Sequence, residues 1–175
     1  PASIQAVVHE TIEKFGQLDV LVNNAGYAQM GPLEGIDEEA LRRQFDVNVF
    51  GATNLIREVL PHFRSRQSGT IINVTSMGGR QTYPLACAYH GTKYAMEGLS
   101  ESLQFELRPF NIRVKIVEPG GTKTDFITAG NRWAEHSAYQ AMVDGFRETS
   151  LKLNAGLKGP EPVAEMIYRA ATDTN

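Results

Sequence analysis

Residues 18–26 read LDVLVNNAG, and the first five of them are nearly continuous in apolar character. Such a run is typical of a strand that is covered on both faces of a sheet. Before it, apolar residues recur at helical spacing from Ile4 to Phe15, and Gly16 is a natural end for that helix. The stretch therefore predicts a helix, then a buried strand, then a glycine-containing turn.

The alternation of helix and strand continues along the chain. After a glycine-rich stretch at 24–35, Asp37 is a good N-cap, and apolar residues recur at helical spacing to about Arg66, as one long helix or two fused ones. The remaining predicted elements are strands at 70–75 and 112–118, a helix at about 86–107, irregular structure with short helices at 121–160, and a last helix at 161–172. This order predicts an α/β fold with a parallel sheet between helical layers.

Length and strand number indicate a single domain that is not complete. The 175 residues suit one domain, on a prior of roughly 150 residues per domain. Three parallel strands form a poor self-sufficient sheet, because unpaired edges invite association. We therefore expect residues 1–175 to be one truncated domain, with further strands before Pro1 and after Asn175.

The composition excludes several classes of protein. The net charge of −3 offers no electrostatic footprint for nucleic acid or an anionic membrane. No apolar run approaches the roughly 18 residues of a spanning helix, and no signal-peptide pattern is present. The single cysteine excludes an internal disulfide, and the four histidines lack metal-ligand spacing. We expect a soluble, cytoplasmic protein with no metal site, no membrane contact and no nucleic-acid partner.

The unusual segments all follow the ends of predicted strands. Residues 23–26 follow the first strand, residues 76–79 the second, and residues 119–120 the third. Ligands of parallel sheets bind beyond the carboxyl ends of the strands. The three segments are therefore expected to line one cleft.

Tyr89 and Lys93 are the strongest candidates for chemistry. They lie four residues apart on a predicted helix, so their side chains share a face. An ammonium group near a phenol favours the phenolate and lowers the phenol pKa from its ordinary value of about 10. The pair could then give a proton to a carbonyl oxygen or take one from an alcohol. Two surface residues in a chance contact would show the same spacing.

Three further positions could assist this pair. The Ser76 hydroxyl could steady the same substrate oxygen, or it could simply form a turn beside two glycines. Asn48 lies on the apolar stripe of its helix, where a buried amide needs hydrogen-bond partners. It is either a functional residue or an asparagine that bends the helix. Gly26 lets the backbone of residues 23–26 approach a ligand closely, or forms a turn.

Together these segments resemble the short-chain dehydrogenase/reductase family. The matching stretches are LDVLVNNAG (18–26), FDVNVFG (45–51), GTIINVTS (69–76), YHGTK (89–93) and NIRVKIVEPGGTKTDF (111–126). The resemblance implies a Rossmann-type, doubly wound parallel sheet, of which this chain holds a part. It also implies an NAD(P)(H)-dependent oxidoreductase that transfers a hydride between the nicotinamide and a ketone or secondary alcohol. The general similarity is nearest to the hydroxysteroid and retinol dehydrogenase-like branch.

The resemblance assigns roles to individual residues. Tyr89 matches the general acid/base, and Lys93 matches the lysine that lowers its pKa and holds the nicotinamide ribose. Ser76 matches the stabiliser of the substrate oxygen, and Asn48 matches the asparagine that anchors a water in the proton relay. The residues matched to the cofactor site are Asn23, Ala25 and Gly26 beside the adenosine, and Pro119, Gly120, Thr122 and Thr124 beside the carboxamide and phosphates. In the family, the helices that carry Asn48 and Tyr89 form contacts of a homodimer or homotetramer.

The family's TGxxxGxG phosphate loop and the residue that selects the coenzyme would both precede Pro1. The residues present therefore do not select between the two coenzymes. The resemblance implies NADP or NAD, and NADP is slightly favoured. A non-catalytic interaction or dimerisation module is one alternative, and a melting temperature that NAD(H) and NADP(H) leave unchanged would support it. A nucleotide-sugar epimerase or dehydratase is another, because it shares Tyr-x-x-x-Lys. The NNAG segment and the Pro-Gly pair after Glu118 fit that branch poorly.

Residues 121–155 are expected to form a substrate loop or lid. The aromatic and large apolar residues of this segment are Phe126, Trp133, Tyr139, Met142 and Phe146. They could line an apolar site for a lipid-like, steroid-like or retinoid-like ketone or alcohol, or they could pack the lid onto the body. The substrate, which is expected to be a small molecule, is not identified by the sequence.

Overall fold

The structure of the protein is a computed structural model that describes residues 2–128 and 131–173. Its helices and strands are α1 Ala2–Phe15, β1 Val20–Asn23, β2 Ala28–Met30, α2 Glu38–Phe45, α3 Ala52–Arg66, β3 Gly69–Val74, α4 Cys87–Leu107, β4 Ile112–Val117, α5 Asp125–Thr128, β5 Asn131–Trp133, α6 Gln140–Asn154 and α7 Glu161–Thr172. Short 3-10 turns and a π-helical segment lie between some of them. Among these described residues, no helix is both long and apolar enough to cross a bilayer.

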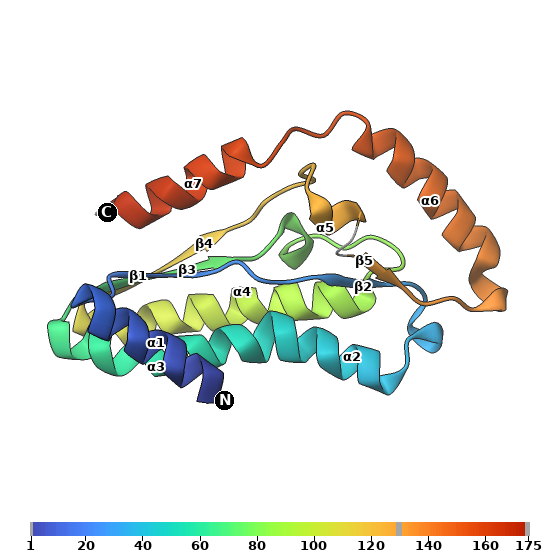
Figure 1. The fold of residues 1–175 in the computed structure, drawn as a ribbon. Helices are drawn as coiled ribbons and strands as arrows, with labels where there is room; N and C mark the ends of the chain where they lie inside the picture. Colours follow the sequence, from blue (N-terminus) through green and yellow to red (C-terminus); the bar gives the residue numbers. More distant parts are fainter. Residues whose placement is uncertain (1, 129–130, 174–175) are drawn as a thin grey trace.

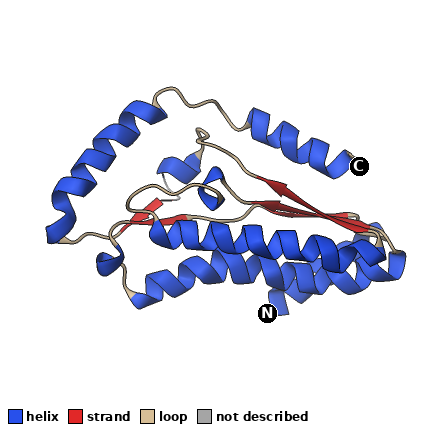
Figure 2. Cartoon of the chain, turned by 180° about the vertical axis from the view of Figure 1, so that it is seen from behind, coloured by secondary structure: helices blue, strands red, loops and turns tan. Residues whose placement is uncertain are grey.

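Three parallel strands form the central sheet in the order β1-β3-β4. Val20 of β1 pairs with Thr70 of β3, and Val74 of β3 pairs with Val117 of β4. Helices α3 and α4 lie against one face of the sheet, with α1 beside α3, and α7 lies over β3 and β4 on the other face (Figure 1). Figure 2 shows the same layers from behind. The predicted α/β architecture with a parallel, Rossmann-like sheet between helical layers is confirmed.

The main core lies between the sheet and α3. Val59 and Phe63 are four residues apart on α3, so both point at the sheet, where they meet Ile71 of β3. Burial of a side chain as large as phenylalanine stabilises the fold by about 2–3 kcal/mol. Gly69 begins β3 directly under Phe63, and a Cβ at this glycine would collide with the aromatic ring. This packing fixes the distance between helix and strand.

Strand β1 corrects one expectation from the sequence. Val22 is 40% exposed, so β1 is not covered on both faces as its apolar run predicts. Within the described residues β1 pairs with β3 alone, and α7 covers β3 and β4 rather than β1. The run of apolar residues therefore predicted the strand correctly, whereas the prediction that both of its faces are covered was wrong.

The helical region from Asp37 to Arg66 is continuous but not uniform. The Asp37 carboxylate accepts a hydrogen bond from the Ala40 amide at 2.6 Å and starts α2, as its sequence predicts. Between α2 and α3 the turns widen into a π-helical segment, Asp46–Gly51. Such segments often occur at functional sites. This one turns Asn48 inward.

A second, two-stranded sheet was not predicted. Strands β2 and β5 pair in parallel, with Ala28 opposite Asn131. Residues 24–35 were expected to be a glycine-rich loop, and residues 121–160 to hold only short helices, but α6 has 15 residues. Three-residue strands carry too little periodicity to be recognised from sequence. The pairing attaches the segment after β4 to the segment after β1.

Candidate active site

Ser76 lies just beyond the carboxyl end of β3. It caps the 3-10 turn Met77–Gly79, and its Oγ accepts a hydrogen bond from the Gly78 amide at 2.9 Å. The turn is also tied to the segment after β4, because the Met77 amide donates to the Pro119 carbonyl at 3.0 Å. Two of the segments that were expected to share a cleft are thus in direct contact.

Tyr89 and Lys93 lie on the face of α4 that meets this turn. Both side chains are buried, and the Lys93 Nζ is 5.8 Å from the centre of the Tyr89 ring. The Nζ donates a hydrogen bond to the Val74 carbonyl, the last of β3, at 3.1 Å. The Ser76 side chain interacts with the Tyr89 phenol and by itself acts to lower its pKa. The structure therefore brings Ser76, Tyr89 and Lys93 together, as the sequence predicts.

Burial controls the protonation of this group. It raises the pKa of Tyr89 to about 12, although the hydrogen bond with Ser76 acts in the opposite direction. It lowers the pKa of Lys93 to about 8, against the opposing charge of Glu97. The expectation that Lys93 lowers the Tyr89 pKa is not met in this structure: desolvation outweighs the opposing effect of Ser76, and the nearby Tyr83 adds to the rise. Tyr89 is consequently a protonated phenol at neutral pH.

An ion cluster around Arg80 was missed from the sequence. Arg80 contacts Glu97 and Glu101 of α4 at 3.1 and 2.9 Å, and Glu118 at the end of β4 at 2.8 Å. It therefore joins the Ser76 turn, α4 and the segment after β4. Burial raises the pKa of Glu97, whose side chain is 4% exposed and lies one turn beyond Lys93. The spacing of these residues gives no local signal, because they come from three separate elements.

Asn48 holds the segment that follows β1. Its Oδ1 accepts from the Tyr27 amide at 3.1 Å, and its Nδ2 donates to the Tyr27 carbonyl at 2.9 Å and to Thr92 Oγ1 at 3.1 Å. The buried amide thus has the partners that its position on an apolar stripe requires. A place in a proton relay stays a prediction for this residue. Gly26 passes close to it, since a Cβ there would lie 3.2 Å from Asn48 Oδ1.

The residues matched to the cofactor site surround the carboxyl ends of β1 and β4. Asn23 is the last residue of β1 rather than part of a turn; its Nδ2 donates to Asn73, whereas its buried Oδ1 has no hydrogen-bond partner among the described residues. Ala25 and Gly26 are exposed just beyond it. The residues that follow β4 are Pro119, Gly120, Thr122 and Thr124. The free Oδ1 and the accessible backbone fit a nucleotide, which needs polar groups and close approach.

Two threonine hydroxyls after β4 are engaged locally. Thr122 Oγ1 donates to the Gly120 carbonyl at 3.1 Å, and Thr124 Oγ1 accepts from the Phe126 amide at 3.3 Å. Both hydroxyls therefore stabilise the turn into α5. A Cβ at Gly120 would lie 3.5 Å from Met77 Sδ, so this turn also packs against the Ser76 turn.

Aromatic side chains from the segment after β4 surround Tyr89. Phe126 lies 5.9 Å from the Tyr89 ring, and Phe146 of α6 lies 6.0 Å from both Trp133 and Tyr83, between ring centres. Together with Ala28, Met30 and Ala86, these rings form a small apolar cluster. Three of the five aromatic or apolar residues predicted for the lid therefore lie near the candidate site.

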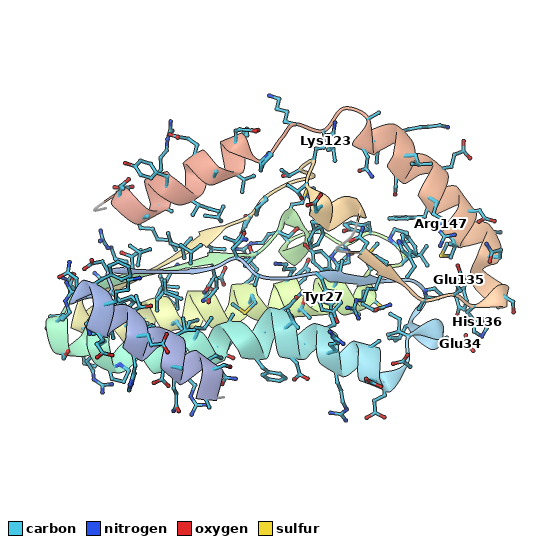
Figure 3. All side chains as sticks on the ribbon, viewed as in Figure 1. Tyr27, Glu34, Lys123, Glu135, His136 and Arg147 are labelled. Carbon is cyan, nitrogen blue, oxygen red and sulfur yellow. The ribbon has the colours of Figure 1, made fainter. Side chains whose placement is uncertain are left out.

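The other two, Tyr139 and Met142, lie elsewhere. Tyr139 donates a hydrogen bond to Glu34 at 3.1 Å, and Met142 is 51% exposed. Glu34 also lies 3.7 Å from His136, at the end of the molecule where Figure 3 shows both side chains together. These contacts attach the start of α6 to the loop after β2.

No cluster of three or more metal-ligating side chains occurs in residues 2–128 and 131–173. The titratable groups at the site include the Tyr89 phenol, the Lys93 ammonium group and the carboxylates around Arg80. Such a set can move protons and bind a polar oxygen.

Comparisons with known proteins identify the relatives of this chain. The sequence profile described as short chain dehydrogenase matches residues 1–135. An uncharacterized oxidoreductase of Schizosaccharomyces pombe is 43% identical over 172 residues, which are 98% of this chain and 73% of that protein. Bovine retinol dehydrogenase 8 is 46% identical over 111 residues, which are 63% of this chain and 36% of that protein.

Solved structures share the fold. A short-chain dehydrogenase from Streptomyces avermitilis superimposes with a TM-score of 0.86 at 37% identity. The match covers 99% of this chain and 63% of that one, so the chain spans less than two thirds of the solved protein. The profile match, the identity to relatives and the parallel sheet lead to one conclusion: the chain belongs to the short-chain dehydrogenase family of oxidoreductases.

Proposed function

We propose that the protein transfers a hydride between a nicotinamide coenzyme and the carbonyl carbon of a ketone, or the carbinol carbon of a secondary alcohol, with Tyr89 as general acid/base. The observation that carries this proposal is the contact of Ser76, Tyr89 and Lys93 at the carboxyl end of β3. Three groups that can hold and protonate one oxygen atom lie at the edge where parallel sheets bind ligands.

Tyr89 acts as the acid in the direction of reduction. The coenzyme, when bound, supplies the hydride that the carbonyl carbon gains. The phenol is protonated at neutral pH, because burial raises its pKa to about 12, so its Oη can give a proton to the carbonyl oxygen. Ser76 hydrogen-bonds to that oxygen and to the phenol. Lys93, with a pKa of about 8, can return a proton toward Tyr89 after each turnover.

The coenzyme is NADP or NAD, with NADP slightly favoured. Asn23, Ala25 and Gly26 would meet its adenosine half, and Pro119, Gly120, Thr122 and Thr124 would meet its nicotinamide and phosphates. A 3-ketoacyl-(acyl-carrier-protein) reductase from Brucella melitensis, 32% identical over 73% of this chain with a TM-score of 0.71, was solved with NADH. The free Oδ1 of Asn23 and the exposed backbone after β1 support the same ligand class here.

Residues 121–155 serve as the substrate loop of a single truncated domain in this proposal. The support is the contact of Phe126 with Tyr89 and the stacking of Phe146 on Tyr83. Apolar rings next to the acid favour an apolar ketone or alcohol. The S. pombe and retinol dehydrogenase relatives carry names that agree with an oxidoreductase.

The helices that carry Asn48 and Tyr89 form the contacts of a homodimer or homotetramer in this proposal. Phe50, which follows Asn48 in the π-helical segment, is more than half exposed, and so is Phe105 on α4, at 79%. Large apolar side chains that face solvent on adjacent helices are typical of an interface between subunits. Figure 1 shows the two helices side by side.

The substitution Tyr89→Phe tests the proposed reaction. In the full-length protein it removes the proton and leaves the ring packing, so turnover of apolar ketones should fall at least about 100-fold. The Kd of NADPH should change less than twofold. Oxidation of NADPH followed by absorbance, with Tyr94→Phe on the exposed side of the same helix as the control, measures both. Turnover that survives Tyr89→Phe would refute the mechanism, and wild-type protein that binds neither NADH nor NADPH would favour the non-catalytic module.

A further inference from the structure

His90 follows Tyr89 on α4 and is itself buried. Its Nδ1 lies 2.7 Å from the Gly78 carbonyl oxygen, and its Nε2 accepts a hydrogen bond from the Tyr83 amide at 3.0 Å. A carbonyl oxygen can only accept, and an amide N–H can only donate. Both contacts are therefore satisfied by one form of the ring, the neutral imidazole with its proton on Nδ1.

The first of these contacts leads to Ser76. The Gly78 amide donates to Ser76 Oγ at 2.9 Å, while the Gly78 carbonyl accepts from His90. Both polar groups of this residue are thus fixed, one by the serine and one by the imidazole. There is also little room for a side chain at Gly78, because a Cβ there would lie 3.1 Å from His90 Nδ1 and 3.2 Å from Tyr89 Cε1. The turn that positions the Ser76 hydroxyl rests on His90 and Tyr89 together.

The second contact leads to the aromatic residues beside the site. The Tyr83 ring meets the His90 ring edge-on, with 4.3 Å between their centres, and stacks on Phe146 of α6. His90 therefore holds the loop between β3 and α4 at two points, one before and one after Arg80. Hydrogen bonds between a buried ring and two backbone groups restrict a loop that has little other regular structure.

We infer that His90 is a positioning residue, whose neutral Nδ1-protonated ring fixes the turn Met77–Gly79 and so aligns the Ser76 hydroxyl with Tyr89. The inference rests on the proposed function for its effect on turnover. His90 does not touch the reacting atoms; it acts through Gly78 and Ser76. Tyr89 carries out the proposed proton transfer, and His90, the next residue in the sequence, keeps the Ser76 hydroxyl in place beside it.

Three variants of the full-length protein test this role. His90→Phe keeps the ring volume and loses both hydrogen bonds, so kcat for reduction of an apolar ketone should fall at least about tenfold, since small displacements of a catalytic group are costly. The Kd of NADPH should stay within twofold. His90→Asn places an amide donor near the Gly78 carbonyl and should recover most of the lost kcat. The matched control is His62→Phe, because His62 Nε2 also accepts a backbone amide, that of Leu18 at 3.2 Å, at the far end of β1.

Two measurements on His90 need no turnover. Nitrogen-15 NMR of labelled histidine should show a neutral ring protonated on Nδ1, and hydrogen exchange at the Tyr83 amide should be at least about tenfold faster in His90→Phe. Wild-type kcat in His90→Phe, an equal loss of kcat in His62→Phe, or a ring protonated on Nε2 would overturn the inference. Absence of ketone turnover in the wild type would instead overturn the proposed function, and the NMR and exchange results would still decide whether His90 fixes the turn.

Discussion

The Tyr27 carbonyl is held by two buried amides, which makes a double-mutant cycle informative. Asn48 Nδ2 donates to this oxygen at 2.9 Å and Gln44 Nε2 at 2.7 Å. Each amide also has a partner of its own: Asn48 Oδ1 accepts from the Tyr27 amide, and Gln44 Oε1 accepts from the Gln29 amide. Removing one side chain therefore leaves one backbone N–H without its acceptor, whereas the Tyr27 oxygen keeps a donor. Asn48→Ala also ends the hydrogen bond to Thr92 Oγ1, whose hydroxyl keeps the Tyr89 carbonyl as its acceptor.

The expected losses in the free energy of unfolding follow from the hydrogen bonds that each variant removes. An orphaned N–H with little access to water costs about 1–3 kcal/mol, so Asn48→Ala and Gln44→Ala should each lower the free energy of unfolding by about 2 kcal/mol. The double variant orphans the Tyr27 oxygen as well, which neither single variant does. Its loss should exceed the sum of the single losses by about 1 kcal/mol, as expected for side chains that share one partner.

Urea unfolding followed by circular dichroism measures the cycle. With an m-value of about 2 kcal/mol/M, each single variant should shift the midpoint by about 1 M, and the double variant by about 2.5 M. Two losses that add within about 0.3 kcal/mol would show that the amides do not share the Tyr27 carbonyl, and the reasoning would fail. Arg57→Ala, at an exposed position of α3, is a control that should leave the midpoint nearly unchanged.

Two further outcomes are expected. Burial lowers the pKa of Lys93 from 10.5 to about 8, so between those values the unfolded chain binds more protons than the folded one, and stability rises with pH. Relative to Lys93→Met, the wild-type free energy of unfolding should therefore increase by about 3 kcal/mol from pH 8 to pH 10.5, and a constant difference across that range would contradict the buried ammonium. At the proposed interface, Phe105→Glu should reduce the oligomer to a smaller species in sedimentation velocity, while Leu151→Glu, on a residue of α6 that is 73% exposed, should not. An unchanged oligomer in Phe105→Glu would place the contact elsewhere.

Features with strong local signals were predicted well. The N-cap at Asp37 and the last helix, Glu161–Thr172, are confirmed, because capping residues and helical periodicity act within a few residues of sequence. The parallel order of β1, β3 and β4 follows from the alternation of strands with long helices. The grouping of Ser76, Tyr89 and Lys93 follows from the rule that strand ends share one edge of a sheet.

Features that depend on distant partners were not predicted. Strands β2 and β5 lie about a hundred residues apart, and Arg80 gathers carboxylates from α4 and from the end of β4. Neither leaves a pattern along the chain, because each exists only once the elements have packed.

By itself, the amino-acid order determined which residues become helix or strand and which side chains share the carboxyl edge of the sheet, since periodicity, capping and strand direction are local properties. Only the tertiary structure decided the charge state of those side chains. The spacing of Tyr89 and Lys93 predicted a lowered phenol pKa, whereas burial among elements remote in sequence raises it. Desolvation depends on everything packed around a group, and for that reason the surroundings of Tyr89 keep its phenol protonated although a lysine lies one turn away.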